Sequence, residues 1–277
     1  MKKQIEAAPS ESMHNLWLQA HRSVFSLTFE NAEGRIASGT GFKVGNYLVT
    51  NNHVIQMSSA RKIVLRGVLE DGYSNALNLT FGHLEFKNML VDVDPEGGWD
   101  FAILKIAHPD FNVIPALPLS ESENVTIGAQ IALFGYQFEQ PNLSMHIGYI
   151  SSQYHKAGVH YLQLDSSVNH GNSGGPLIDA DTGCVIGIVT RKATGLTQQF
   201  DDLMAAFRQN IVQLEALQRG PSRVTVAGIN PVSAALTTQV QMERISKEIS
   251  RSANVGIGYA YHIKKVRGSL TNLDTVY

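Results

Sequence analysis

Between residues 24 and 190 the sequence is a succession of short apolar or alternating segments bounded by turn residues. Alternation with period two between glycine, asparagine or aspartate residues is typical of short β-strands. The first half of the chain contains such segments at 24–29, 36–44, 47–50, 62–68, 77–86, 90–93 and 101–106. The second half contains them at 130–134, 144–151, 161–165, 176–178 and 184–190. Two successive sets of about six short strands predict two antiparallel β-barrels.

Three further segments have apolar residues at helical spacing, at 10–20, 200–219 and 232–249. A strand-like segment at 256–261 follows the last of them, which makes the second and third helices an insertion within the second barrel. The expected fold class is therefore all-β: two six-stranded antiparallel barrels with a short N-terminal helix and a helical-hairpin insertion. The expected boundaries are an N-terminal extension over 1–21, a first barrel over 22–114, a second barrel over 121–265 with the insertion at about 193–253, and a C-terminal tail over 266–277.

The composition limits the classes of function that the chain can have. Hydrophobic residues make up 43% of the 277 residues and charged residues 17%, which is sufficient for a substantial core. The net charge of -2 and the absence of a basic run argue against a nucleic-acid partner. No stretch of 18 apolar residues or secretory signal is found, so we expect neither a membrane span nor export, and a cytoplasmic location. A single cysteine excludes an intrachain disulfide.

Three residues in this chain could carry chemistry, although each has an ordinary structural alternative. Ser173 lies between glycines in the segment 171–175, where backbone amides can approach a substrate closely, but glycine and serine are also common in turns. His53 follows the predicted strand 47–50, and a lone histidine is usually structural. Asp100 opens a very apolar strand, so it is either a cap or a buried acid with a partner.

Taken together, these residues resemble the trypsin-like (chymotrypsin-fold) serine proteases and, within them, the bacterial HtrA/Deg-like branch. The order histidine, aspartate, serine is the order of that family. The motifs that carry the resemblance are Ser38-Gly39-Thr40-Gly41-Phe42, Tyr47-Leu48-Val49-Thr50-Asn51-Asn52-His53-Val54, Asp100-Phe101-Ala102-Ile103-Leu104-Lys105-Ile106, Gly171-Asn172-Ser173-Gly174-Gly175-Pro176-Leu177 and Gly256-Ile257-Gly258-Tyr259-Ala260. They cover about residues 22–192 and 253–265. Only residues 263–277 follow His262, so we expect no PDZ domain.

The resemblance implies a serine endopeptidase with a protein or peptide substrate. Ser173 would be the nucleophile, His53 the general base and acid, and Asp100 the residue that orients the imidazole. The amides of Gly171 and Ser173 would bind the oxyanion. The resemblance implies neither a metal nor a cofactor.

The resemblance also implies limits on activation and specificity. Asn172 stands where digestive relatives carry an aspartate that binds a newly cleaved N-terminus, and asparagine cannot form that salt bridge, so we expect no activation by clipping. Ser167, Thr190, Lys192 and Ile257 are the candidate substrate-binding residues. Without an acid at Ser167, a preference for small or medium apolar residues is expected. Arg191 and Lys192 could instead attract an acidic side chain, or be solvated loop charges.

The sequence allows more than one role for the helical insertion and more than one function for the chain. The apolar faces of the two helices could pack on each other and on the second barrel. They could also form a surface for a regulatory partner or for self-association. The chain as a whole could be a non-catalytic or conditionally active protein-binding module on a protease scaffold, although the complete set of three residues argues for catalysis.

Overall fold

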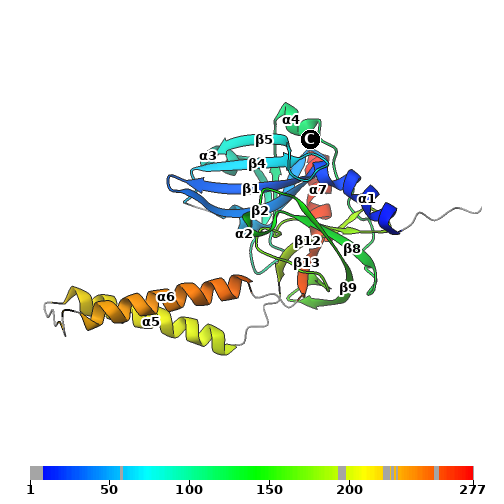
Figure 1. Cartoon of the computed structure of the whole chain (residues 1–277). Helices are drawn as coiled ribbons and strands as arrows, with labels where there is room; N and C mark the ends of the chain where they lie inside the picture. Colours follow the sequence, from blue (N-terminus) through cyan, green and yellow to red (C-terminus); the bar gives the residue numbers. More distant parts are fainter. Residues whose placement is uncertain are drawn as a thin grey trace, which may run out of the picture. The chain divides into compact units, whose positions relative to one another are not determined.

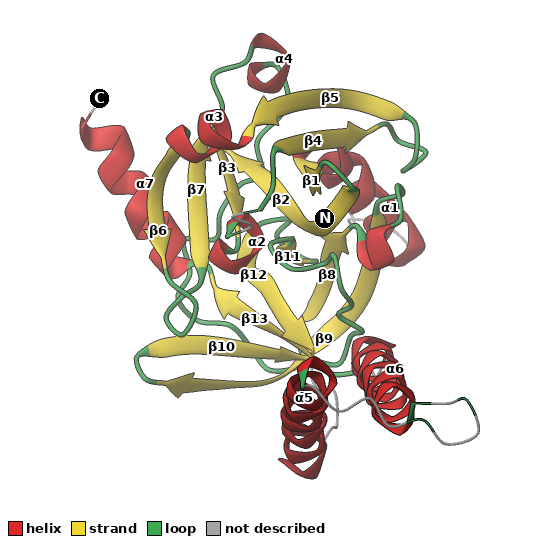
Figure 2. Ribbon diagram, turned by 90° about the vertical axis from the view of Figure 1, so that its left-hand side faces the viewer, coloured by secondary structure: helices red, strands yellow, loops and turns green. Residues whose placement is uncertain are grey.

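The first half of the chain folds into a seven-stranded antiparallel sheet (Figure 2). The structure is a computed structural model, and it describes residues 9–56, 59–192, 198–220, 225, 228, 230–252 and 256–276. In spatial order its strands are β5 (Asn75–Gly82), β4 (Lys62–Val68), β1 (Val24–Asn31), β2 (Gly34–Val44), β3 (Tyr47–Thr50), β7 (Phe101–Lys105) and β6 (Leu90–Asp94). β5 and β6 are the two edge strands and do not pair with each other, so the sheet does not close into a barrel. The predicted six-stranded first barrel is therefore wrong in strand number and in closure.

The cause of the open barrel is helix α3 (His83–Asn88), which interrupts the segment predicted as one strand at 77–86. The Gly82 amide donates a hydrogen bond to the Glu85 carboxylate at 3.1 Å, and such a contact stabilises the first turn of a helix. β5 pairs only with β4, and β6 pairs only with β7. Helix α3 thus occupies the position in the chain where one continuous strand would have joined the two edges.

The second half of the chain forms a closed six-stranded barrel, as predicted. In spatial order its strands are β10 (Val159–Leu164), β13 (Gly258–His262), β12 (Val185–Lys192), β11 (Pro176–Asp179), β8 (Gln130–Gly135) and β9 (Ser144–Lys156). Buried aliphatic side chains that alternate along these strands fill its interior, among them Leu133, Leu162, Leu177 and Val189. The short helices α2 (Asn52–Ile55) and α4 (Pro109–Asn112) follow β3 and β7, and 3₁₀ turns lie at His21–Ser23, before β1, and at Gln137–Glu139, between β8 and β9.

One of the hydrophobic clusters joins the two sheets to helix α1 (Pro9–Ala20) and to the C-terminal segment that includes Val266 and Leu270. It contains Phe42 and Phe101 from the first sheet and Phe134 from the second barrel. Helix α1 adds Leu16 and Ala20, which are buried, and its Trp17 ring stacks on Phe134 at 6.0 Å. The two barrels and the N-terminal helix therefore belong to one compact unit, Met1–Ala193 with Gly256–Tyr277.

The segment expected to be a C-terminal tail belongs to helix α7 (Lys264–Val276). Val266 and Leu270 lie one helical turn apart and are buried in the shared core, so this helix is packed and is not a loose end. All helices together, including α1 and the two helices of the insertion, make up 32% of the chain, so the fold is mostly β and not all-β.

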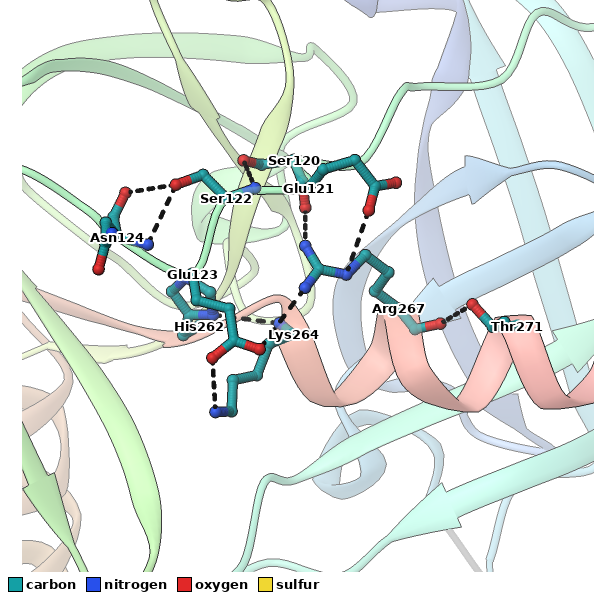
Figure 3. Close-up of polar contacts among 9 residues, drawn as sticks. All are labelled: Ser120, Glu121, Ser122, Glu123, Asn124, His262, Lys264, Arg267 and Thr271. Carbon is teal, nitrogen blue, oxygen red and sulfur yellow. Dashed lines mark hydrogen bonds and ion pairs between the residues drawn. The ribbon is translucent and has the colours of Figure 1, made fainter.

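Polar contacts attach the first turn of α7 to the linker between the barrels (Figure 3). The Lys264 ammonium lies 3.2 Å from a Glu123 carboxylate oxygen, and Arg267 donates to the Ser120 carbonyl. The Lys264 hydrogen bond and charge hold the pKa of the exposed Glu123 carboxyl below its usual value. Beside them His262 is buried, and burial together with the neighbouring His160 lowers its pKa to about 4.

The helical insertion forms a compact unit of its own, Thr194–Val255, with the two helices labelled in Figure 1. Helices α5 (Gln198–Arg219) and α6 (Pro231–Ser252) pack on each other, and Gln218 Nε2 donates to Ser233 Oγ at 3.1 Å. Among the described residues of this unit, only Met204 belongs to the buried hydrophobic set. Apolar side chains that remain about half exposed are Leu203, Val212, Leu217, Met242, Ile245 and Ile249.

Candidate active site

His53 and Asp100 lie next to each other where two neighbouring strands of the first sheet end and begin. β3 ends at Thr50, and His53 is the second residue of the short helix α2, whereas Asp100 directly precedes β7. His53 Nδ1 lies 2.6 Å from Asp100 Oδ2, and the His53 amide donates to Oδ1 at 3.0 Å. The carboxylate thus binds the imidazole and the backbone of the same residue, and this fixes the ring orientation.

Asp100 is held in an unusual backbone conformation by the segment that carries His53. Its φ angle is +44°, in the left-handed region, and it is 1% exposed. Its carbonyl accepts hydrogen bonds from Asn51 Nδ2 at 2.8 Å and from the Asn52 amide at 3.2 Å. A non-glycine residue in this region costs about 1–3 kcal/mol, so these contacts maintain a strained position that points the carboxylate at the imidazole.

Ser173 lies on the loop between β10 and β11, in the second barrel. Its hydroxyl donates to the Thr190 carbonyl at 2.7 Å, and no hydrogen bond joins it to His53 among the described residues. The side chain is half-buried, and His53 is 32% exposed, so solvent reaches both groups. A rotation about the Cα–Cβ bond of Ser173 is needed before its proton can pass to the imidazole, and such contacts often tighten only when substrate binds.

The loop before Ser173 requires glycine at Gly171 and presents two backbone amides. Gly171 has a φ angle of +95°, and a Cβ atom there would overlap the carbonyl oxygen of Tyr136. Among the described residues, neither the Gly171 amide nor the Ser173 amide has a hydrogen-bond acceptor. Two unpaired amides on either side of one residue are the kind of donors that bind a developing oxyanion.

Thr40, in the first sheet, fixes this loop of the second barrel. Its hydroxyl donates to the Gly171 carbonyl at 2.6 Å and accepts from the Tyr136 amide at 3.1 Å. Its own amide donates to the Ser173 carbonyl at 2.9 Å. We assigned no role to Thr40 from the sequence, because its partners lie far away in the chain. The only signal was its place in the segment 38–42.

Asn172 is fully buried, and neither its side-chain oxygen nor its nitrogen has a hydrogen-bond partner among the described residues. Its amide donates to the Asn169 carbonyl at 3.0 Å. A neutral side chain at this position needs no buried cationic partner, whereas a carboxylate would need one.

The structure places three of the four candidate substrate-binding residues on neighbouring segments. Gly258, which follows Ile257, lies against Ser166 and Val168, the residues on either side of Ser167. Ser167 and Ile257 are half-buried, whereas Thr190 is buried and accepts the Ser173 hydroxyl. The side chain of Lys192, and that of Arg191, lie outside the described part of the chain.

The described part of the chain contains no group of three or more histidine, cysteine, aspartate or glutamate side chains that could hold a metal ion. Among the described helices, none is long and apolar enough to cross a membrane.

Comparison with known proteins gives the same family as the motifs. Residues 37–188 match the trypsin-like peptidase domain. Serine protease HTRA1A of Danio rerio is 31% identical over 178 residues, which are 61% of this chain and 33% of the relative. Mitochondrial serine protease HTRA2 of Bos taurus is 32% identical over 176 residues, 60% of this chain and 34% of the relative. The chain thus spans about a third of the length of these curated relatives.

Solved structures with the same fold include an HtrA-type protease, AlgW, bound to a tripeptide, with a TM-score of 0.57 and 22% identity. That match covers 94% of this chain and 62% of the AlgW chain. Deg5 matches with a TM-score of 0.53 and 23% identity, over 68% of this chain and 88% of its own. At these identities the two matches establish the fold alone.

Proposed function

This chain belongs to the family of trypsin-like peptidases, and from this premise we propose that it is a serine endopeptidase that acts through Ser173, His53 and Asp100. The observation that carries the proposal is the 2.6 Å contact of His53 Nδ1 with the buried Asp100 carboxylate. Because Nδ1 is engaged by Asp100, Nε2 is the imidazole nitrogen that remains available to accept a proton. A hydroxyl and two unpaired amides lie on the loop of the second barrel that Thr40 ties to the first sheet.

The proposed reaction has two stages, acylation of Ser173 and hydrolysis of the acyl ester, and His53 transfers the proton in both. Ser173 Oγ attacks the peptide carbonyl while His53 Nε2 takes the hydroxyl proton, and the oxyanion receives hydrogen bonds from the Gly171 and Ser173 amides. His53 then gives the proton to the leaving amine, which leaves an acyl ester on Ser173. Water hydrolyses the ester with His53 again acting as the base. Asp100 stabilises the imidazolium in both stages and remains ionised.

A fluorophosphonate probe tests the nucleophile without knowledge of the physiological substrate. The wild-type protein is expected to take up one equivalent of probe, and Ser173→Ala none, because the hydroxyl oxygen is the atom that attacks phosphorus. Labelling is measured by intact-protein mass spectrometry. Ser151→Ala is the matched control, since it removes an exposed hydroxyl from β9 and should leave labelling intact. Equal labelling of wild type and Ser173→Ala would contradict the assignment.

The second candidate function is a non-catalytic or conditionally active protein-binding module on the same scaffold. The hydrogen bond from the Ser173 hydroxyl to the Thr190 carbonyl favours it, because that contact directs the proton away from His53. The same experiment separates the two functions. Absence of labelling in the wild type, with the fold intact by circular dichroism, would favour the binding module.

We also propose that cleavage follows small or medium apolar residues. Ser167 brings no negative charge to the segment beside Gly258, so a substrate ammonium or guanidinium would find no partner there. Ile257 contributes apolar surface. Cleavage of a peptide library, analysed by mass spectrometry, is expected to show Ala, Val or Leu before the cut bond at least tenfold more often than Lys or Arg. A dominant preference for Lys or Arg would overturn this specificity.

The helical unit is proposed to bind a regulatory partner or a second copy of the chain. Met242, Ile245 and Ile249 recur at intervals of three and four residues and remain about half exposed, which is typical of a helix face that meets another surface. Deletion of residues 195–250 with a short linker is expected to leave the barrels folded but to change the oligomeric mass or the rate of peptide cleavage. Light scattering and the rate of probe labelling measure these effects. If neither changes, the regulatory role is wrong.

A further inference from the structure

A cavity of about 500 Å³ lies inside the first sheet, close to the position where the barrel fails to close. Its walls come from β1, β4, β6 and β7 and from helices α2 and α3. Helix α3 follows edge strand β5 and precedes edge strand β6 in the chain (Figure 2). The apolar lining includes Phe29, Ile63, Phe86, Leu90, Val93 and Leu104. Pockets of about 300–1,000 Å³ with mostly apolar walls are the usual size for small organic ligands.

Three polar groups in this cavity have no internal partner and point to the chemistry of an occupant. Asn52 is 3% exposed, and its side-chain amide makes no hydrogen bond with any described residue. The Asn52 side-chain atoms are not among the fully buried polar atoms that lack a partner, so the amide reaches the solvent-accessible space of the cavity and is available to a ligand. Lys87 is exposed on α3, and neither it nor the neighbouring His83 side chain makes an ion pair or hydrogen bond with a described residue. The cavity therefore combines apolar walls with one lysine and one histidine among its described lining residues.

We propose that this cavity binds an amphipathic carboxylate of the medium-chain fatty acid type. The alkyl chain would lie against the phenylalanine and aliphatic walls, because removal of apolar surface from water is the main favourable contribution of such a site. The carboxylate would accept from the Lys87 ammonium, with His83 beside it. One lysine and one histidine suit a single negative charge better than a phosphate dianion. Asn52 would contact an acceptor of the ligand or of a water bound with it.

The proposed ligand would touch the helix that carries His53. Asn52 and Ile55 of α2 line the cavity, and His53 lies between them in the sequence. The Asn52 amide also donates to the Asp100 carbonyl at 3.2 Å. An occupant that changes the position of Asn52 thereby acts on the contact between α2 and Asp100. This coupling makes the ligand an effector of the proposed peptidase, and it rests on that proposed function.

The binding test uses isothermal titration calorimetry with dodecanoate, below its critical micelle concentration, on the Ser173→Ala protein. Saturable binding at one site per chain is expected. Lys87→Glu should weaken it at least tenfold, because the rim then repels the carboxylate. Val93→Trp, which places an indole at the half-exposed edge of the cavity, should abolish it. Lys156→Glu, the same charge change on β9 of the second barrel, is the matched control and should leave the affinity within twofold.

Each contrary result removes a stated part of the proposal. Absence of saturable binding, or equal affinity in the Lys87→Glu and control proteins, would overturn the carboxylate site. Dodecanol binding as tightly as dodecanoate would also overturn it. Lys87 is exposed, so Lys87→Glu is expected to fold. This variant therefore still tests the site if Val93→Trp fails to fold.

Dodecanoate should also change kcat/KM of the wild type at least twofold, and have no such effect in Val93→Trp. Binding without this change would overturn the coupling to α2. Binding to a chain that cleaves no peptide would instead contradict the proposed function and leave the site standing.

Discussion

Replacement of Asp100 by asparagine is expected to lower kcat by about 10⁴-fold without unfolding the protein. The carboxylate accepts from His53 Nδ1 at 2.6 Å and from the His53 amide at 3.0 Å. Asparagine can retain the second contact through its oxygen, but its NH₂ group opposite Nδ1 favours the tautomer that has its proton on Nε2. That tautomer cannot accept the proton of Ser173, so the base is lost while its position is kept.

The measurement is the rate constant of fluorophosphonate labelling together with kcat and KM on a peptide found by the library experiment. Asp181→Asn is a matched control, since this residue lies exposed on the turn between β11 and β12. Circular dichroism verifies that both proteins are folded. A decrease of less than tenfold for Asp100→Asn would mean that Asp100 has a structural role only.

The second large effect is expected for Lys43, which is buried in the first sheet and forms no ion pair with a carboxylate of the described residues. Its ammonium donates to the carbonyls of Phe111 at 2.8 Å, Asn112 at 3.0 Å and Ile114 at 2.6 Å, and lies 5.0 Å from the centre of the Phe111 ring. Burial lowers the pKa of this lysine. The Phe111 carbonyl also accepts from the Ile114 amide at 3.2 Å, whereas the Asn112 and Ile114 carbonyls have the ammonium as their donor among the described residues.

Lys43→Met is therefore expected to lower the free energy of unfolding by about 3 kcal/mol, because each buried polar group left without a partner costs about 1–3 kcal/mol. Removal of the cost of burying a charge offsets part of this loss. Urea unfolding followed by tryptophan fluorescence measures the difference, with the exposed Lys156→Met as control. A loss below about 1 kcal/mol would show that water or a shift of the backbone replaces the ammonium.

The sequence was most informative where function requires particular residue types in a short segment. His53, Asp100 and Ser173 each lie in such a segment, and the structure brings the first two into contact at the expected strand ends. Thr40 and Lys43 were not identified, because a threonine or lysine in a strand looks ordinary until its partners are known. The Lys43 partners are about 70 residues further along the chain.

The sequence predicted the elements well where the spacing of apolar residues determines whether a segment is a strand or a helix. It predicted them less well where a local hydrogen bond starts a helix. The strands of the second barrel and the two helices of the insertion follow their apolar patterns closely. Residues 83–86 could continue the strand before them by pattern alone, but the contact between Gly82 and Glu85 starts a helix. Helix α7 was not predicted, although Val266, Leu270 and Leu273 recur at intervals of four and three residues and contact the shared core.

The contacts of Thr40 have a consequence for how the protein comes apart. The loop that holds Ser173 takes its shape partly from a hydroxyl in the other half of the chain, and Tyr136 reaches the same half through its own hydroxyl, which donates to the Val24 carbonyl at 3.3 Å. Neither half alone contains all of the hydrogen-bond donors and acceptors that hold this loop in place. We therefore expect the loop to take this shape only after the two halves of the chain have docked.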